Sequence, residues 1–238
     1  RSVSRFGDPD SYWHESATAL ATAYFLQRGT PFIYQGQEIG MLGGSLCESS
    51  DFRDVESLGY LASLEGDEVP AGLTAMSRDN GRTPMQWDGS PTAGFTESTP
   101  WIDVPPSASG INVAAQIEDP ASILSYYKAL IDARHRIPAL TEGSFERIDV
   151  GCPALFVYRR QMAGSEVLVM ANLSGTVHSP QFPTSDEAWA PSHWDLYLCN
   201  TDVPLASGSL HSRDGEDRDV RPDDSMKPWE ARVYLRTL

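Results

Sequence analysis

The spacing of apolar residues changes partway along the chain, and this change constrains the fold more than any other feature. Apolar side chains recur at helical spacing in two segments, residues 12–27 and 122–136. After residue 143 the period becomes two, in short runs that turn residues separate. Helices followed by a series of alternating strands predict an α+β chain that ends in an antiparallel β domain.

The residues at the ends of these segments predict where each element begins. Residues 10–11 (Asp-Ser) should cap the first helix, and residues 119–120 (Asp-Pro) should open the second. Residues 32–34 (Phe-Ile-Tyr) predict a short buried strand, and residues 55–63 predict a short helix inside the loop-like segment 36–120. The β domain should be a small antiparallel sandwich with strands at residues 145–150, 155–159, 166–172, 194–199 and 231–235.

The stretch SRDNGRTPMQWDG at residues 77–89 is the strongest candidate for a recognition loop. It places Arg78 and Arg82 four residues apart, next to Asp79 and shortly before Trp87. Guanidinium groups suit the fixed geometry of sugar hydroxyls, and an indole offers a flat apolar wall for a sugar ring. The alternative is a solvated polar loop in which Arg78 pairs with Asp79 and Trp87 fills the core.

Composition excludes several other classes of function. The 238 residues carry a formal charge of −15 without a dense basic cluster, so nucleic acid is a poor partner. No apolar run is long enough to span a membrane, and no signal peptide is visible. The cysteines, Cys47, Cys152 and Cys199, are widely separated and suggest a reducing, cytoplasmic setting. The histidines lack the spacing of metal ligands, and neither a metal nor a cofactor is expected.

A series of motifs then connects the chain to a family. They are TPFIYQGQEIGM from residue 30, DFRDVESLGY from 51, SRDNGRTPMQWD from 77, AGF from 93, PWI from 100, INVAAQ from 111 and SILSYYKALIDAR from 122. In this order they resemble the α-glucosidase and oligo-1,6-glucosidase branch of the α-amylase superfamily. Weaker matches, VLVMANLSG and PWEARVYL, lie in the β domain.

The resemblance implies a fold and a reaction. Residues 1–137 would be the C-terminal piece of a (β/α)8 barrel, ending in its final βα segment, and residues 138–238 a C-terminal β-sandwich domain. The enzyme would hydrolyse short α-linked gluco-oligosaccharides with retention, through a nucleophilic Asp, an acid/base Glu and a supporting Asp. The resemblance places all three before the segment that RSVSRFGD matches. We therefore expect no catalytic residue in this chain, and no activity of the chain alone.

Substrate binding is the role that remains for these residues. The resemblance assigns contact with the hydroxyls of the terminal glucose to Arg82, with Arg78 as the alternative, and places Arg1 near the substrate rim. Trp87 and other aromatic residues of the loop, Phe95 and Trp101, are expected to pack the loop. The nearby carboxylates do not match catalytic positions of the family; they are Asp51, Asp54, Glu56, Asp79 and Asp88.

Two other functions stay open at this point. Residues 137–238 could form a carbohydrate-binding module, although Trp189, Trp194 and Trp229 are irregularly spaced for one. They could instead only stabilise the barrel of the parent enzyme. The two long helices should pack on the β domain or on a second copy of the chain, so self-association is expected, and residues 43–109 should be the least ordered segment. The sequence does not decide between α-1,6 and α-1,4 linkages.

Overall fold

The computed structural model describes residues 1–66, 68–182, 194–201 and 221–237, and these divide into two compact units. The loop unit comprises Arg1–Phe6 and Ile33–Asp119, and the helix–sheet unit comprises Gly7–Phe32 and Pro120–Leu238. The boundary expected after residue 137 concerns the domains of the whole protein and stays a prediction.

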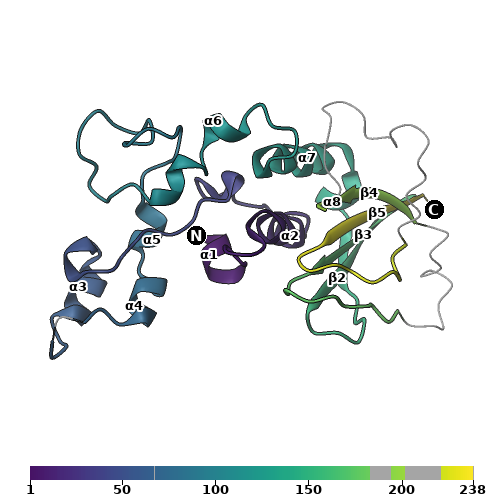
Figure 1. Cartoon of the computed structure of the whole chain (residues 1–238). Helices are drawn as coiled ribbons and strands as arrows, with labels where there is room; N and C mark the ends of the chain where they lie inside the picture. The colour runs from purple at the N-terminus through teal and green to yellow at the C-terminus, as the bar shows by residue number, and fades with distance from the viewer. Residues whose placement is uncertain (67, 183–193, 202–220, 238) are drawn as a thin grey trace. The chain divides into compact units, whose positions relative to one another are not determined.

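The helix–sheet unit contains a five-stranded antiparallel sheet with the strand order β1-β2-β3-β5-β4 (Figure 1). Every expected strand is present within a few residues of its predicted bounds. The strands are β1 Ser144–Arg147, β2 Leu155–Met162, β3 Ser165–Asn172, β4 Asp195–Cys199 and β5 Ala231–Thr237. A sandwich requires two sheets, and the described residues form a single sheet. The sandwich itself therefore stays a prediction.

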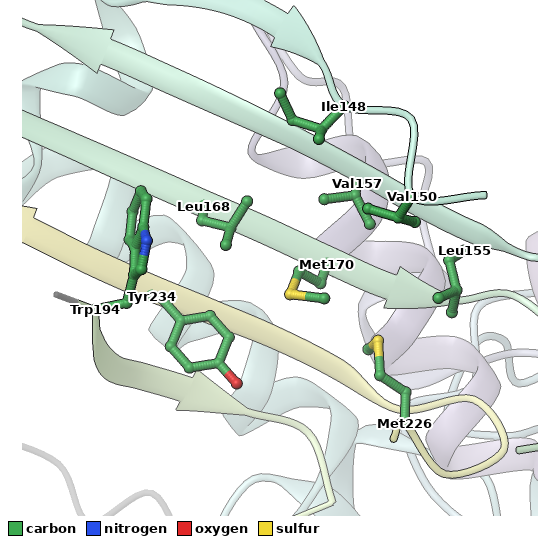
Figure 2. Close-up of a cluster of buried hydrophobic side chains, with 9 residues drawn as sticks. All are labelled: Ile148, Val150, Leu155, Val157, Leu168, Met170, Trp194, Met226 and Tyr234. Atoms are coloured by element: carbon green, nitrogen blue, oxygen red, sulfur yellow. The ribbon is translucent and has the colours of Figure 1, made fainter. Parts of the chain in front are cut away.

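The central strand β3 is buried on both faces, so both faces of the sheet are covered at this strand. Leu168 and Met170 point to one face, where they join a cluster of apolar side chains from β2, β5 and the flanking loops (Figure 2). Val169 and Ala171 alternate with them and point to the other face. There Ala171 packs with small residues of a helix, Ala19 among them.

That helix is α2, Trp13–Phe25, which lies against β3 and β5. Its outer neighbour is α7, Ile123–Arg136, and the short α8, Pro138–Thr141, follows at once. Both long helices were expected from periodicity, and both are confirmed. Buried hydroxyl groups add to the helix contacts, since Thr22 Oγ1 and the Tyr126 hydroxyl lie 2.6 Å apart.

The expected helix caps are wrong in detail. Helix α2 begins after Tyr12 without a side-chain cap. Residues 10–11 instead belong to the turn before the helix, where the Asp8 carboxylate accepts from the Ser11 amide at 2.9 Å. Helix α7 is capped by Ser122, whose hydroxyl accepts from the Ser125 amide at 3.2 Å, rather than by residues 119–120.

Two arginines close the C-terminal end of α2 within the same unit. Arg134 of α7 donates to the carbonyl oxygens of Phe25, Gln27 and Gly29 at 2.8–2.9 Å. Arg160 of β2 is fully buried and donates to four carbonyl oxygens, those of Leu26, Leu140, Gly143 and Ser144. Cations at a helix C-terminus satisfy carbonyls that lack a helical partner, so these side chains join α2 to α7 and to the sheet.

The loop unit is made of short helices and loops, and no strand is present among its described residues. Its α-helices are α1 Ser2–Phe6, α3 Val55–Leu61, α4 Ala71–Met76, α5 Asp79–Arg82 and α6 Val113–Gln116. Its 3-10 helices are η1 Gln37–Ile39, η2 Ser49–Asp51 and η3 Pro106–Ser109. Helix α3 confirms the helix expected at residues 55–63.

The buried strand expected at residues 32–34 is not present. Phe32 and Tyr34 are 83% and 56% exposed. The main chain of Tyr34 is bonded to Gln37 in a turn: its carbonyl accepts from the Gln37 amide at 2.9 Å and its amide donates to Gln37 Oε1 at 3.2 Å. Gly36, at a φ of 83°, makes the turn possible. The main-chain amide and carbonyl of Tyr34 are therefore bonded within the turn, and they pair with no neighbouring strand among the described residues.

Candidate substrate-binding site

The candidate site lies in the loop unit, where α3 and α5 face each other through polar side chains. Asp54 is the N-cap residue of α3: its Oδ2 accepts from the Ser57 amide at 3.2 Å and from the Ser57 hydroxyl at 3.1 Å. The motif DVES thus carries an ordinary N-terminal helix signal, which places the Asp54 carboxylate at the start of α3 with its second oxygen facing α5.

Asp79, the first residue of α5, is fully buried and fastens the two helices together. Its Oδ2 accepts from the main-chain amides of Arg53 and Asp54 at 2.7 and 2.8 Å. Its Oδ1 lies 3.3 Å from Arg82 Nη1. A buried carboxylate with these three donors is well satisfied, and it fixes the register between α3 and α5.

Both arginines of the recognition motif converge on the other oxygen of Asp54. Arg78 Nη2 lies 2.8 Å from Asp54 Oδ1, and Arg82 Nη1 lies 3.3 Å from the same atom. Arg78 also contacts Glu56 at 3.2 Å and is 58% exposed, whereas the side chain of Arg82 is 37% exposed. The pairing of Arg78 with Asp79 that a bland polar loop would have is thus replaced by pairing of both arginines with Asp54.

The environment of Asp54 favours its charged form. Burial acts to raise its pKa, but hydrogen bonds from Ser57 and the contact with Arg78 outweigh burial, and the pKa is lowered from its ordinary value. Asp54 is therefore an anion at neutral pH, where it attracts both guanidinium groups.

Arg1, the third predicted site residue, lies next to the segment that follows Arg82. It donates to the carbonyl oxygen of Gln35, and through Nη2 to the carbonyl and hydroxyl oxygens of Thr83 at 3.2 and 3.0 Å. Its guanidinium also lies 5.5 Å from the ring centre of Tyr34. Burial lowers its pKa, with Tyr34 and Glu38 acting in the opposite direction. Arg1 thus joins residues 34–35 to Thr83.

Two other acidic residues of the loop unit, Asp51 and Asp88, stabilise turns. Asp51 accepts from the amides of Cys47 and Glu48 at 2.8 Å. Asp88 accepts from the amide and hydroxyl of Ser90 at 2.9 and 2.5 Å, and these bonds lower the pKa of Asp88. These carboxylates are acceptors for local main-chain groups.

The aromatic residues of the loop are more exposed than expected. Trp87, Phe95 and Trp101 are 51%, 51% and 65% exposed, so the expectation that they pack the loop is wrong. The physical reason lies in the main chain. The amide of Trp87 bonds to the Ala93 carbonyl, and its carbonyl accepts from the Ala114 amide, both at 2.9 Å. The main chain at Trp87 is thus fixed by backbone bonds, while its ring stays outside.

Sequence reasoning found the arginines but missed what holds them. Asp54 was considered only as a catalytic candidate, and Asp79 only as that or as a partner of Arg78. The helix signal at Asp54 and Ser57 was readable, whereas the burial of Asp79 depends on contacts between segments that lie 25 residues apart.

Neither a group of metal ligands nor a membrane-spanning helix is found in the part of the chain that the structure describes. Within residues 1–66, 68–182, 194–201 and 221–237, no three His, Cys, Asp or Glu side chains form a group that could hold a metal ion. In the same part of the chain, no helix has the length and apolar character that crossing a bilayer requires.

Comparison with known proteins gives the family. Residues 1–143 match the model of the alpha amylase catalytic domain. The chain is 39% identical over 240 residues to an oligo-1,6-glucosidase of Parageobacillus thermoglucosidasius, covering 98% of this chain and 40% of that protein. It is 37% identical over 242 residues to a trehalose-6-phosphate hydrolase of Bacillus subtilis, again covering 40% of the relative and all of this chain.

Solved structures agree with the sequence relatives. The trehalose-6-phosphate hydrolase of Bacillus licheniformis superposes with a TM-score of 0.83 at 35% identity, over 100% of this chain and 41% of that one. A trehalulose synthase from Pseudomonas mesoacidophila gives a TM-score of 0.80 at 34% identity, over 99% and 41% of the two chains. The chain therefore spans about two fifths of the length of these relatives. By its match to the catalytic domain and by these relatives, the chain belongs to the alpha-amylase family.

Proposed function

We propose that the protein to which this chain belongs is a retaining α-glucosidase, and that Arg82 binds the terminal glucose of its substrate. The substrates would be short α-linked gluco-oligosaccharides, of the isomalto or malto type. Support comes from family membership and from relatives named oligo-1,6-glucosidase at 35–42% identity. The absence of paired cysteines in the described residues suits the cytoplasmic location that we expect.

The observation that carries the assignment of Arg82 is the state of its guanidinium. Nη1 lies 3.3 Å from each of two buried carboxylates, Asp54 and Asp79. Within the part of the chain that the structure describes, Nη2 and Nε donate no hydrogen bond, and the side chain is 37% exposed. An arginine that is anchored at one nitrogen and open at the others can offer directed donors to sugar hydroxyls.

Arg78 and Arg1 take lesser roles in this proposal. Arg78 is the more exposed side chain and is paired with Glu56 as well as Asp54, so we assign it to the outer edge of the site. The terminal nitrogens of Arg1 bond to Gln35 and Thr83, and we therefore propose that Arg1 supports the rim through the main chain.

We also propose that the 238-residue chain alone does not hydrolyse glycosides. Asp54 and Asp79 are both paired with Arg82 Nη1 at 3.3 Å, so neither carboxylate is available to act with the other as nucleophile and acid on a glycosidic bond. The lowered pKa of Asp54 further makes it a poor proton donor at neutral pH. The reacting carboxylates would then come from the remaining three fifths of the protein.

A barrel-stabilising role for residues 138–238 is compatible with this function, and one contact set favours it. Asn200 donates to the Glu15 carbonyl, the Thr18 hydroxyl and the Trp229 carbonyl at 2.8–3.1 Å, so it joins α2 to the segment just before β5. Arg160 holds the other end of α2. The sheet thus supports a helix of the matched catalytic segment at both ends.

The test is an assay of the full-length protein on isomaltose, maltose and trehalose 6-phosphate, next to the 238-residue chain alone. We expect turnover of a neutral disaccharide by the full-length protein, because a net charge of −15 in this part weakly disfavours an anionic substrate. Preference for trehalose 6-phosphate would move the function to the other class of relatives. Turnover by the chain alone would contradict the proposed division of labour.

A further inference from the structure

One carboxylate oxygen serves both arginines of the candidate site. Asp54 Oδ1 accepts from Arg78 at 2.8 Å and from Arg82 at 3.3 Å, while Asp54 Oδ2 is bonded to Ser57. The side chain of Asp54 is 4% exposed, so water does not compete strongly for it. The two arginines therefore compete for one buried acceptor.

The contacts of Asp54 and Asp79 form a closed ring around Arg82. The Asp54 amide donates to Asp79 Oδ2, Asp79 Oδ1 accepts from Arg82, and the same Arg82 nitrogen donates to Asp54 Oδ1. The side chain of Asp54 thus contacts the Arg82 guanidinium directly, and its main-chain amide is connected to the same guanidinium through Asp79. A ring of this kind fixes the direction in which the remaining nitrogens of Arg82 point.

Such a restraint matters because a free arginine is a flexible side chain. Both long cationic side chains carry about 2 kcal/mol of rotamer entropy, which a ligand must overcome if the protein has not already done so. Helix α5 has only four residues and supplies little support of its own. The restraint on Arg82 must come from its carboxylate partners.

We propose that Asp54 is a positioning residue that pre-orients Arg82 for the substrate hydroxyls, and that Arg78 tunes this restraint by sharing Asp54 Oδ1. The proposal rests on the function proposed above for Arg82. Asp54 itself touches no substrate, and its effect on binding passes through the arginine.

The substitution Asp54→Asn separates positioning from structure. Asparagine keeps the shape of the side chain and is an equally good N-cap, so Ser57 keeps an acceptor. The charge that holds the arginines is lost. Ser57→Ala is the matched structural control, because it disturbs the same cap and leaves the charge. Asp132→Asn is the chemical control, because it breaks an Asp–Arg pair of 2.8 Å on α7.

The first experiment measures rotation of the Arg82 guanidinium by nitrogen-15 NMR in the 238-residue chain, with Arg82→Lys to assign the signal. We expect rotation about tenfold faster in Asp54→Asn than in the unsubstituted chain, as the loss of a charged hydrogen bond would give. Ser57→Ala and Asp132→Asn should leave the rate unchanged. Equal rates in the unsubstituted chain and in folded Asp54→Asn would overturn the proposal.

Arg78→Met gives a second test that does not depend on the folding of Asp54→Asn. Removal of the competing arginine leaves Asp54 Oδ1 to Arg82, so rotation of Arg82 should become slower. Faster or unchanged rotation in Arg78→Met would show that the two arginines do not share the oxygen in solution, which would also overturn the proposal.

The second experiment measures isomaltose hydrolysis by the full-length protein. A loosened Arg82 should weaken binding of ground state and transition state alike, so Asp54→Asn should raise KM about tenfold with kcat nearly unchanged. A purely structural defect would instead lower the amount of active enzyme, which reduces apparent kcat at constant KM. That second pattern would contradict the positioning role.

The two experiments keep the two proposals apart. If the full-length protein hydrolyses no glycoside, the proposed function fails, and the rotation of Arg82 in the chain still decides whether Asp54 orients it. If the enzyme is active and Arg82→Lys is impaired while Asp54→Asn has the KM of the unsubstituted enzyme, the positioning proposal alone fails.

Discussion

The contacts that stabilise the interior of the helix–sheet unit differ in kind from those that stabilise the loop unit. In the former, alternating apolar residues of β3 are buried on both faces, between α2 and the cluster of Figure 2. In the latter, the candidate site depends on a buried carboxylate, Asp79, which binds main-chain amides and an arginine. Burial of regularly spaced apolar side chains stabilises the helix–sheet unit. In the loop unit, hydrogen bonds and ion pairs between distant segments fix the site.

The largest expected effect comes from a buried charge of the helix–sheet unit, Arg160. Arg160→Met leaves four carbonyl oxygens without their donor. Since each unsatisfied buried group costs roughly 1–3 kcal/mol and some will relax, we expect a loss of about 3–5 kcal/mol. Hydrogen exchange of the β2 and β3 amides measures it. Arg147→Met, an exposed arginine of β1, is the control and should change exchange little.

Alkaline pH should act next, and mainly on the helix–sheet unit. Burial raises the pKa of Tyr126 and of Tyr158, and Tyr126 is also bonded to Thr22. Unfolded tyrosine ionises near pH 10, so above that pH the unfolded state releases protons that the folded state retains, and stability falls.

The expected loss is roughly 1.4 kcal/mol for each of the two tyrosines per pH unit above 10. Unfolding by urea at pH 9, 10 and 11 measures it, and Tyr126→Phe should reduce the slope. Earlier loss of exchange protection in the loop unit than in the sheet would break the contrast between the units.

Acid pH should act on the loop unit instead. The pKa values of Asp54 and Asp88 are lowered, so their contribution to stability is complete above the unfolded value near 4 and disappears as the pH falls through the lower folded value. We expect amide protection around α3 and α5 to decline below pH 4 before that of β3. In Asp54→Asn the decline should be shallower, and an unchanged decline would rule out Asp54 as its source.

These differences also explain what could be read from the sequence. Period and turn residues predicted α2, α7 and all five strands, because a buried face leaves a repeating pattern. The strand expected at residues 32–34 was wrong because Gln37 bonds to Tyr34 in a turn. Arg82 was found by motif, but the burial of its partner Asp79 was not, because Asp79 bonds to the amides of Arg53 and Asp54, which lie about 25 residues away and share no local pattern with it.

The smallest expected effect is a stabilising one, from a substitution in α5. A Cβ at Gly81 in α5 would lie 3.6 Å from the Tyr34 hydroxyl, an ordinary contact. Gly81→Ala should therefore stabilise the loop unit by about 0.5–1 kcal/mol. Gly94→Ala is the control: Gly94 has a φ of 63°, and a Cβ there would lie 2.7 Å from Asp88 Oδ2, so this substitution should be destabilising. Hydrogen exchange of the α5 amides distinguishes the two, and a destabilised Gly81→Ala would show that α5 is packed more tightly than described.

The central claim is that Arg82, anchored by Asp54 and Asp79, binds the substrate of an α-glucosidase. Steady-state hydrolysis of isomaltose by the full-length protein tests it most directly, with Arg82→Ala measured beside Arg78→Ala. We expect Arg82→Ala to lower kcat/KM about 100-fold, as loss of one or two charged hydrogen bonds would give, and Arg78→Ala to have a much smaller effect. An Arg82→Ala enzyme with unchanged kcat/KM would contradict the account.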